Sequence, residues 1–584
     1  MSIRTAAEAL VRVMVEHGID TVFGTVGHGN LPLVDAIAGE PRLRYISAYH
    51  EQVAIHAADA YYRTSGRVAA VVTTVGPGAT NLTTGLGDAL LDCSAVVVIT
   101  GGVPSAYVRR DPLQALSVAV DNAQWEIFRP LTKRVHPVGS ARDVVPEFRR
   151  AYAEAINGRP GPVLLHVPLD FFSEGIEDEG GAGPSPRYVP YPDPTAIARA
   201  AALIRAAECP LIYAGGGAQQ QNAPEAVSAL ASRYGIPVAT SMSGQGVINE
   251  DHPLSLGTTG VVGTRTGNTA IREADVVIAI GTRFPEMDAS SWRPDFFAQF
   301  PPARLIHIDI DPDVINRGVF PAEVGIVADA AAAAGALAEE LADSPPSFPA
   351  WRERVAELKS AWEQELAVVR ATDQLPFEPA YLLTRLRAAL PDDAVLVSGV
   401  GIRHAVAQHF AIRRPRTLVV GSGFGTMGQE PAAAIGAAQA LPGRAVVAPI
   451  GDGALLACLA AIPTAVTAGT NLTWLLLDNG GYASIAVYQA KHYGRLLGTD
   501  FVTSGAKPYA VDYTQLARSF GAWTDRVTSA EDLEPKLKAA IAYDGPAMLV
   551  VPVTPRPRIQ GTGHWDVNDI FAAGAAIRAG SGDG

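Results

Sequence analysis

Residues 445–481 read AVVAPIGDGALLACLAAIPTAVTAGTNLTWLLLDNGG, and this stretch decides the fold. Its two apolar runs, 445–453 and 472–481, each end in a polar turn, and an apolar helical segment joins them. Strand-like runs that alternate with helical segments are typical of a parallel sheet covered by helices. We therefore expect two parallel strands whose polar turns open at the same edge of one sheet.

The same alternation continues along the chain in three blocks. Strand-like runs recur between residues 68 and 170, between 210 and 312, and between 394 and 553. Stretches rich in Gly and Pro separate the blocks at 173–193 and 343–350. The chain is thus predicted to be an α/β protein with three doubly wound parallel-sheet domains. The expected domains are 1–175, 190–345 and 360–555, followed by a tail, 556–584, that is either disordered or a lid.

Composition argues against several classes of function. The net charge is −13, and no cluster of Lys and Arg stands out, which argues against a nucleic-acid partner because phosphates bind clustered cations. Cys93, Cys209 and Cys458 are far apart in the sequence and form neither a disulfide framework nor a CxxC metal site. Every apolar run falls short of the roughly 18 residues that span a bilayer. We expect a cytoplasmic protein, with no membrane partner, that acts on a small molecule.

The two polar turns at 451–453 and 478–481 carry the strongest functional signal. Ligands of open α/β sheets bind beyond the carboxyl ends of the strands, so both turns can face one crevice. Mg²⁺ prefers oxygen ligands and shares them with phosphates. We predict that Asp452, Asn479 and a backbone carbonyl near Gly481 bind Mg²⁺. Gly453 and Ala454 are expected to begin a helix whose free N–H groups suit a diphosphate. The alternative is that the segments 451–453 and 478–481 are ordinary tight turns, which is what each would indicate by itself.

Taken together, the two turns resemble the GDG and NN signature of thiamine-diphosphate enzymes, with Asp478 in place of the first Asn. VVTTVGPGATNLTTGLGDALLD (71–92) and GSGFGTMGQEPAAAIGAA (421–438) are similar to segments of acetolactate synthases. The resemblance covers about residues 1–555. It implies pyrimidine-binding, central and diphosphate-binding domains in that order. It also implies thiamine diphosphate and Mg²⁺ as cofactors, and a homodimer or homotetramer with active sites between subunits.

The resemblance also assigns roles to single residues. Glu51, at the start of HEQVAIHAADAYYRTSG (50–66), stands where the family has the Glu that bonds N1′ of the cofactor's aminopyrimidine. It is therefore expected to be buried, with its pKa raised by desolvation. Without the resemblance, the simpler interpretation would be a Glu at the start of a helix that is stabilised by the helix dipole. The expected cofactor-binding residues are Gly401, His404, Gly425, Met427, Gly453, Ala454 and Tyr482.

Two further residues are candidates for catalysis. His28, in FGTVGHGNLPLVDA (23–36), stands where simple decarboxylases of the superfamily have a catalytic Asp or Ser and acetolactate synthases have Gly. Its imidazole could relay protons, or it could merely cap a turn. Gln114 aligns with the family's active-site Gln, although Leu113 replaces the usual Phe.

Departures from the family leave the reaction open. Residues 401–406, GIRHAV, lack the Trp of acetolactate synthases, and 283–287, RFPEM, lack the second arginine of their RFDDR motif. Decarboxylation of a 2-oxo acid with carboligation is the leading hypothesis. GHGN (27–30) and HWDV (564–567) resemble enzymes that hydrolyse cyclic 1,2-diones, which is the alternative.

Two other possibilities concern the cofactors. A non-catalytic, cofactor-binding regulatory protein would belong to another class, and the joint presence of Glu51, Asp452 and Asn479 argues against it. Acetolactate synthases bind FAD in the central domain. Here GGG (215–217) lacks the full GxGxxG pattern, so FAD remains open and is not favoured.

Overall fold

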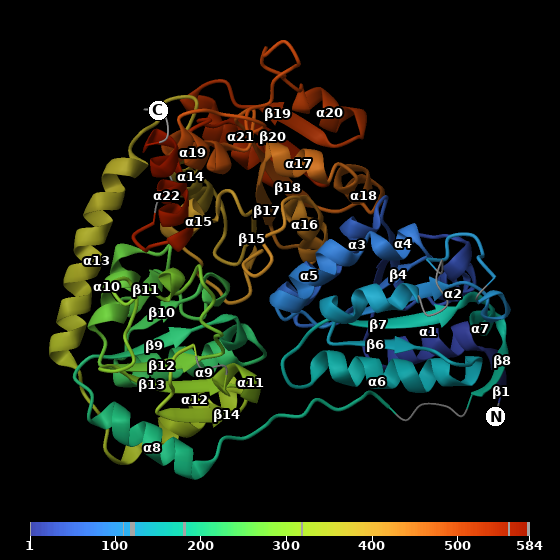
Figure 1. Cartoon of the computed structure of the whole chain (residues 1–584), viewed down its shortest axis with the longest axis horizontal. Helices are drawn as coiled ribbons and strands as arrows, with labels where there is room; N and C mark the ends of the chain where they lie inside the picture. The colour runs from blue at the N-terminus through green and yellow to red at the C-terminus, as the bar shows by residue number, and fades with distance from the viewer. Residues whose placement is uncertain are drawn as a thin grey trace.

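The computed structural model describes residues 2–108, 110–116, 123–178, 183–316, 319–558 and 561–580 (Figure 1). It contains three six-stranded parallel sheets, one in each block, so the predicted α/β fold class is confirmed. In Figure 1 the first domain lies at the right in blue and cyan, and the second at the left in green. The third, in orange and red, lies above and between them.

The first sheet has the strand order β3-β2-β4-β5-β7-β6. Its strands are β2 (Thr21–Gly24), β3 (Arg44–Ser47), β4 (Ala69–Thr73), β5 (Val96–Gly102), β6 (Arg134–Pro137) and β7 (Val163–Pro168). Alternate residues of the central strands pack against α3 and α5 on one face, and against α1, α2 and α6 on the other. The helices of this domain are α1 (Ala6–Glu16), α2 (Leu31–Ala38), α3 (Glu51–Ser65), α4 (Pro77–Thr80), α5 (Thr83–Leu91), α6 (Val144–Ile156) and α7 (Leu169–Ser173).

The second sheet has the order β11-β10-β9-β12-β13-β14. Its strands are β9 (Pro210–Ala214), β10 (Val238–Thr240), β11 (Ser255–Thr258), β12 (Val276–Ile280), β13 (Arg304–Asp309) and β14 (Val324–Val327). The accompanying helices are α8 (Pro194–Arg205), α9 (Ala223–Tyr234), α10 (Arg265–Glu273), α11 (Pro312–Asn316) and α12 (Ala330–Glu340). The long helix α13 (Pro349–Arg370) then runs along the outside of this domain to the third one (Figure 1).

The third sheet repeats the topology of the first, with the order β16-β15-β17-β18-β20-β19. Its strands are β15 (Val395–Ser398), β16 (Leu418–Val420), β17 (Val446–Gly451), β18 (Leu472–Asp478), β19 (Trp523–Arg526) and β20 (Pro546–Pro552). Its helices are α14 (Pro379–Ala389), α15 (Arg403–His409), α16 (Gln429–Ala440), α17 (Asp452–Ala457), α18 (Ala461–Thr467), α19 (Ala483–Tyr493), α20 (Tyr513–Ser519) and α21 (Ala530–Ala542). The stretch 445–481 forms the predicted pair, because β17 and β18 are adjacent and parallel.

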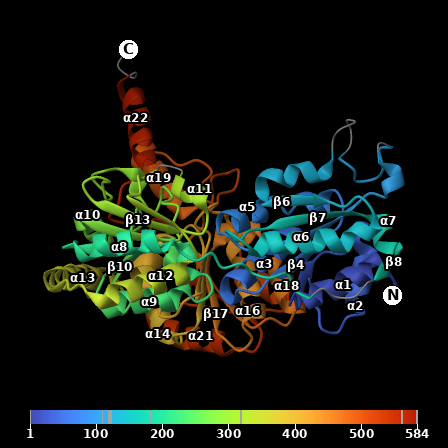
Figure 2. The same ribbon diagram turned by 90° about the horizontal axis from the view of Figure 1, so that it is seen from below.

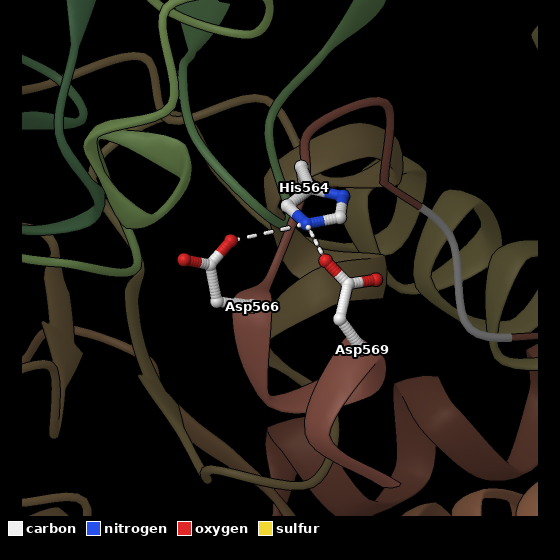
Figure 3. Close-up of side chains that lie close together, drawn as sticks. All are labelled: His564, Asp566 and Asp569. Atoms are coloured by element: carbon white, nitrogen blue, oxygen red, sulfur yellow. Dashed lines mark hydrogen bonds and ion pairs between the residues drawn. The ribbon is translucent and has the colours of Figure 1, made fainter. Parts of the chain in front are cut away.

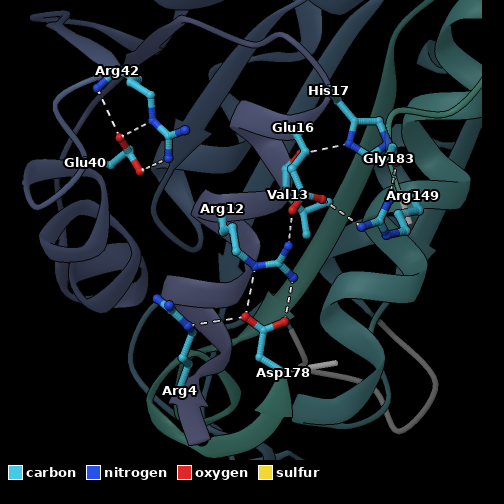
Figure 4. A network of polar contacts seen from close by, with 10 residues as sticks. All are labelled: Arg4, Arg12, Val13, Glu16, His17, Glu40, Arg42, Arg149, Asp178 and Gly183. Atoms are coloured by element: carbon cyan, nitrogen blue, oxygen red, sulfur yellow. Dashed lines mark hydrogen bonds and ion pairs between the residues drawn. The ribbon is translucent and has the colours of Figure 1, made fainter. Parts of the chain in front are cut away.

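The amino-terminal edge holds a short antiparallel pair that the sequence did not predict. β1 (Ser2–Thr5) pairs with β8 (Gly175–Asp178), and a capping box of Thr5 and Glu8 begins α1 directly after β1. Arg12 binds the Asp178 carboxylate at 2.9 and 2.5 Å, and Arg149 binds Glu16 at 3.0 Å (Figure 4). These charged contacts fasten the end of the first domain to its first helix.

The structure describes residues 561–580 of the carboxyl-terminal tail, and the disorder or lid expected of its last stretch stays a prediction. These residues pack on the second domain and then form α22 (Asp566–Gly580), which projects from the body of the molecule (Figure 2). Residues 581–584 of the expected tail lie outside the described residues. Within the described ranges, no helix combines the length and the apolar character needed to cross a membrane.

The first and third domains share one hydrophobic core through α3 and α16. Gly436 of α16 lies so close to α3 that an added Cβ would approach the carbonyl oxygen of Ala57 to 1.8 Å. Beside this crossing, Gln429 donates to Asp59 at 3.3 Å, and Arg44 donates to Gln439 at 3.0 Å. The two domains therefore pack as one body at this crossing.

Gly436→Ala tests this close approach. The added methyl group would push the two helices apart, and overpacking a core costs about 1–3 kcal/mol or more. We expect a lower thermal unfolding temperature by scanning calorimetry. Gly335→Ala, in α12, is the matched control because a Cβ there meets nothing within 4 Å; it should leave the unfolding temperature unchanged or raise it slightly. Equal effects of the two substitutions would contradict this account.

Candidate active site

A cavity of about 580 Å³ opens beyond the carboxyl ends of the third sheet. Its walls come from the segments that follow β15, β16, β17, β18 and β20. The strand order reverses between β15 and β17, and such a switch point is where open α/β sheets bind ligands. All ten residues predicted to bind cofactor or metal line this cavity: Gly401, His404, Gly425, Met427, Asp452, Gly453, Ala454, Asn479, Gly481 and Tyr482.

Asp452 links the two loops of the cavity. Its side chain is fully buried; Oδ1 accepts the N–H of Gly453 at 2.8 Å, and Oδ2 accepts those of Gly480 at 2.7 Å and Asn479 at 3.3 Å. Burial raises the pKa of Asp452 to about 6, as expected for a carboxyl group that lacks a cation. The carboxyl group therefore fixes both loops around one point.

The donors at this point are all oxygen atoms. Asn479 Oδ1 accepts the N–H of Gly481 at 3.2 Å and borders the same cavity as Asp452. A carboxylate, an amide oxygen and a backbone carbonyl suit Mg²⁺, which also takes phosphate oxygens. The residues present therefore fit a divalent cation that carries a diphosphate.

The cavity requires glycine at position 453. A Cβ there would lie 2.5 Å from Cε1 of Tyr482, whose ring packs edge-on against Phe501 at 5.2 Å between centroids. The backbone of this turn is thereby open on the cavity side. The helix after it, α17, has only six residues and begins at Asp452 rather than Gly453. A helix of this length has only a small macrodipole. The backbone N–H groups of the turn therefore explain anion binding better than the dipole of the predicted helix does.

Met427 and His404 also point to a ligand. Met427 is 45% exposed although it lines the cavity, so it is not the core residue that an isolated Met would usually be. His404 is 5% exposed, and its Nε2 has no hydrogen-bond partner among the residues that the structure describes. Burial lowers the pKa of His404 to about 4, so the ring is neutral at pH 7. A buried, unpaired nitrogen on a cavity wall is costly unless a ligand bonds to it.

Glu51 belongs to a second cluster, at the carboxyl edge of the first sheet. Its Oε1 accepts from the Thr25 hydroxyl at 2.8 Å and its Oε2 from the Asn81 amide at 2.9 Å. Glu51 is half-buried, so the expected full burial is wrong for the single chain, because this edge of the sheet faces outward. Sequence reasoning missed Thr25 and Asn81, although both lie inside the segments that carried the resemblance.

His28 and Gln114 lie near the same loop, residues 74–78, which follows β4. His28 is exposed on a 3-10 turn whose neighbour, Gly29, donates its N–H to Thr74 at 3.0 Å. Gly76 touches Gln114, since a Cβ at Gly76 would lie 2.6 Å from the Gln114 carbonyl oxygen. Oε1 of Gln114 is buried, and none of the described residues gives it a hydrogen bond. The three predicted catalytic residues thus gather around one loop.

The two clusters do not form one site within a single chain. None of Glu51, His28 and Gln114 is among the residues that line the cavity in the third domain. Both clusters lie at the switch point of a sheet with the same strand order, the first between β2 and β4 and the second between β15 and β17. The two clusters therefore occupy corresponding positions in the two domains.

Glu430 is a cavity residue that sequence reasoning missed. It is 3% exposed, lines the cavity, and accepts the N–H of Gly428 at 3.1 Å. Its carboxyl group fills the space beside Gly399, where an added Cβ would lie 1.8 Å from Oε1. Burial raises the pKa of Glu430 to about 7. An acidic residue inside the apolar run QEPAAAIGAA (429–438) was the signal available in the sequence.

A second cavity, at the junction of the three domains, tests the possibility of FAD. It is lined by Gly216, Arg283, Asp309 and Ser422, among others, and measures about 110 Å³. Pockets for drug-sized ligands run from about 300 to 1,000 Å³. Arg283 closes it by donating to the Leu91 carbonyl at 2.5 Å. This narrow space does not favour FAD, and we propose no FAD site there.

His564, Asp566 and Asp569 form a further group of charged residues, at the start of α22 (Figure 3). His564 Nε2 lies 3.1 Å from Asp566 and 3.0 Å from Asp569, so these side chains bind one another. The His564 ring also stacks on Phe296 with 4.8 Å between centroids. This group fastens the tail to the second domain, and we assign no metal to it.

Three protein-family models match the chain. Residues 4–124 match "Thiamine pyrophosphate enzyme, N-terminal TPP binding domain", residues 197–337 match the central domain of that enzyme, and residues 399–551 match its C-terminal TPP binding domain. Each match falls on one of the three sheets.

Similar proteins support the same family over nearly the whole chain. A probable acetolactate synthase large subunit of Methanocaldococcus jannaschii is 34% identical over 568 residues, which cover 94% of this chain and 92% of the relative. The acetolactate synthase large subunit of Parasynechococcus marenigrum is 33% identical, with 94% and 87% covered. That of Corynebacterium glutamicum is 34% identical, with 93% and 86% covered.

Glu430→Gln tests the buried acid in the cavity. Its pKa is raised in the folded chain, so the folded state holds an extra proton between pH 4.5 and about 7. Stability due to this group is therefore complete at low pH and is lost as the pH rises through that window. The wild type should therefore lose stability between about pH 5 and about pH 8, and the variant should not lose this contribution. We expect the unfolding temperature of the variant to rise relative to that of the wild type over this range. Glu353→Gln, at an exposed site, should show no such trend; a flat difference for Glu430→Gln would refute the assignment.

Proposed function

The chain belongs to the thiamine pyrophosphate enzyme family, and we propose that it decarboxylates a 2-oxo acid and joins the remaining acyl group to a second carbonyl compound. Thiamine pyrophosphate and thiamine diphosphate are the same cofactor. The observation that carries the proposal is the cavity where Asp452 and Asn479 meet Gly425, Met427 and His404. The similarity to acetolactate synthase large subunits supports the choice of reaction.

The third domain would hold the cofactor through a divalent cation. Asp452, Asn479 and the carbonyl of Gly481 supply oxygen ligands for Mg²⁺, which would bridge to the diphosphate. Gly453 keeps the turn free of a side chain on the cavity side. When bound, thiamine diphosphate supplies a carbon nucleophile and an electron sink for breaking a C–C bond.

Glu51 would act on the cofactor from the facing subunit. Within one chain it lies outside the cavity, so a second copy must bring its own first domain against the third domain of the first copy. There Glu51 would hold a proton at N1′ of the aminopyrimidine, with Thr25 and Asn81 fixing the carboxyl group through bonds of 2.8 and 2.9 Å. A homodimer would be the smallest active assembly, and a tetramer would contain two such pairs.

The proposed reaction balances without an added oxidant or reductant. In the donor 2-oxo acid, the bond between the carbonyl carbon and the carboxylate breaks, and CO₂ leaves. The electron pair remains on the former carbonyl carbon, which then forms a bond to the carbonyl carbon of the acceptor. One proton from solvent ends on the new hydroxyl oxygen. Gln114, with its unpaired buried Oε1, and His28 are the residues proposed to handle protons near this bond.

Hydrolysis of a cyclic 1,2-dione is the second candidate. Its support is the position of His28, which lies exposed next to the loop that also contacts Glu51 and Gln114. An imidazole at that edge could deliver a water molecule to a ring carbonyl. In this reaction a C–C bond of the ring opens and no CO₂ is released.

Product analysis separates the two reactions. Purified protein with thiamine diphosphate and Mg²⁺ would be incubated with 2-oxo acids, alone and in pairs, and with cyclic diones. CO₂ would be followed by a coupled assay and products by mass spectrometry. Release of CO₂ with a coupled product supports the proposal, whereas ring opening without CO₂ supports the alternative. Release of an aldehyde in place of a coupled product would contradict the carboligation.

Glu51→Gln should abolish most turnover without releasing the cofactor. Loss of a positioned proton-transfer group typically lowers the rate by about 10² to 10⁴. We expect turnover to fall by at least about 10², while calorimetry shows unchanged cofactor binding. Glu225→Gln, in the first turn of α9, is the control and should retain full activity. An active Glu51→Gln enzyme would exclude the proposed role.

Asp452→Asn should weaken cofactor binding that depends on Mg²⁺. The variant lacks the anionic oxygen of the proposed metal site, so titration with thiamine diphosphate should show no gain in affinity on adding Mg²⁺. Asp478→Asn is a close control, because the Asp478 carboxylate pairs with Arg526 at 2.8 Å instead of lining the cavity. Circular dichroism should confirm that both variants fold. A full response to Mg²⁺ in Asp452→Asn would rule out this ligand.

A further inference from the structure

A cavity of about 460 Å³ lies where the second and third domains meet along α13. Its walls come from β11 and α10 of the second domain, from α13, and from α14 and the end of α15 in the third domain. Among the described residues, it shares none of its lining with the cofactor cavity. Its volume falls within the range of about 300 to 1,000 Å³ that is typical of ligand pockets. The cavity is therefore a candidate binding site apart from the one that the proposed reaction uses.

Arg387, on α14, is a buried cation on the wall of this cavity. It is 7% exposed, and its Nη2 donates to the carbonyl oxygens of Leu390, at 2.7 Å, and of Pro391. Its Nε has no acceptor among the described residues, and none of their carboxylates lies within 4.0 Å of Arg387. Burying a charge without a counter-ion is costly. An anionic ligand in the cavity would supply what Arg387 lacks.

Two residues of α13 add further donors to the cavity. Lys359 and Trp362 are three positions apart, so they lie on the same face of the helix. Lys359 Nζ donates to the carbonyls of His252 at 2.8 Å and Ser255 at 2.6 Å, which leaves its third N–H without an acceptor among the described residues. Nε1 of Trp362 is buried, and no described residue accepts its hydrogen. Together with Arg387, these side chains place three unused N–H donors around the cavity.

The acidic residues of the cavity do not balance its cations. Asp251 pairs with Arg413 at 2.7 Å, and Glu363 pairs with Arg370 at 2.5 Å. Glu250 is the third acid, and burial raises its pKa to about 7, so only part of it is ionised at pH 7. The two unpaired cations described above therefore give the cavity a positive charge.

One acceptor and an apolar surface complete the lining. Gln408, near the end of α15, is 5% exposed, and its Nε2 donates to the Val262 carbonyl at 3.1 Å. Its Oε1 is buried, with no donor among the residues that the structure describes. Leu256, Leu366 and Phe410 supply apolar surface. A ligand that matches these groups has an anionic end, one hydrogen-bond donor and an apolar body.

A hydroxy acid matches this set better than the alternatives. A carboxylate has two oxygens that can accept from several N–H donors at once, and charge-assisted bonds of this kind are strong. A hydroxyl group can donate to Gln408. An amino acid also brings a donor, but Arg387 and Lys359 would repel its ammonium group in a partly buried cavity. Inorganic phosphate would leave the apolar surface without a contact.

We propose that this cavity binds a small hydroxycarboxylic acid with an apolar side chain, whose carboxylate accepts from Arg387 and Trp362 and whose hydroxyl group donates to Gln408. The site lies at the end of α15, and His404, near the start of the same helix, lines the cofactor cavity. The proposal concerns binding alone and does not depend on the reaction proposed above.

Calorimetry with the holoprotein and 2-hydroxy-4-methylpentanoate tests the proposed site. The wild type should bind this acid, and Arg387→Met should bind it at least about tenfold more weakly, the range expected for losing a hydrogen bond to a charged group. Trp362→Phe removes only an N–H and should cost about fivefold. Arg385→Met is the matched control, because Arg385 is exposed on the same helix and does not line the cavity. Absence of binding to the wild type, or equal binding to Arg387→Met, would overturn the site.

A second variant covers the case in which Arg387→Met does not fold. Ala388 is exposed and lines the cavity, so Ala388→Glu removes no buried contact. The new carboxylate should pair with Arg387 or repel the bound anion, and it should weaken binding by at least about fivefold. Circular dichroism would confirm that the variant folds. Unchanged binding in folded Ala388→Glu would contradict the proposal.

Three further probes test the class of ligand. The neutral amide of the same acid, 2-amino-4-methylpentanoate and inorganic phosphate should each bind at least about tenfold more weakly than the hydroxy acid. Equal or tighter binding of any of the three would overturn the assigned class. Binding that survives in Arg387→Met but disappears in Asp452→Asn would place the acid in the cofactor cavity and would also overturn the proposal.

Discussion

A single buried carboxyl group, that of Asp452, accepts backbone N–H groups from its own turn and from the turn after the neighbouring strand. Backbone donors hold their positions more firmly than flexible side chains, so this group sets the distance between the two loops. Asn479, Gly481 and Gly453 take their places in the cavity from that arrangement. Burial raises the pKa of Asp452.

The first and third domains repeat one arrangement. Their sheets have the same strand order, and the predicted site residues lie at the corresponding switch point of each sheet. The crossing of α3 and α16, at Gly436, packs the two domains against each other within the chain. The two groups of predicted residues thus lie on one body, and a site shared between two copies is what we propose.

Unpaired polar groups mark where ligands are expected. Most buried polar groups of a folded protein are hydrogen-bonded, so the exceptions need an explanation. Among the described residues, His404 Nε2 and Gln114 Oε1 are buried without hydrogen-bond partners. His404 lies in the proposed cofactor cavity, and Gln114 lies in the Glu51 cluster. His564, Asp566 and Asp569 lie within ion-pair distance of one another and anchor the tail.

The sequence by itself determined the three α/β units, because strand-like runs alternating with helical segments leave a parallel sheet as the natural arrangement. It also determined the residues of the cofactor cavity, because Asp452, Asn479 and the glycines lie in short motifs at strand ends. Only the tertiary structure decided that Glu51 lies apart from that cavity in one chain and that Glu430 fills the space beside Gly399. Those facts depend on contacts between residues far apart in the sequence, and no local pattern encodes them.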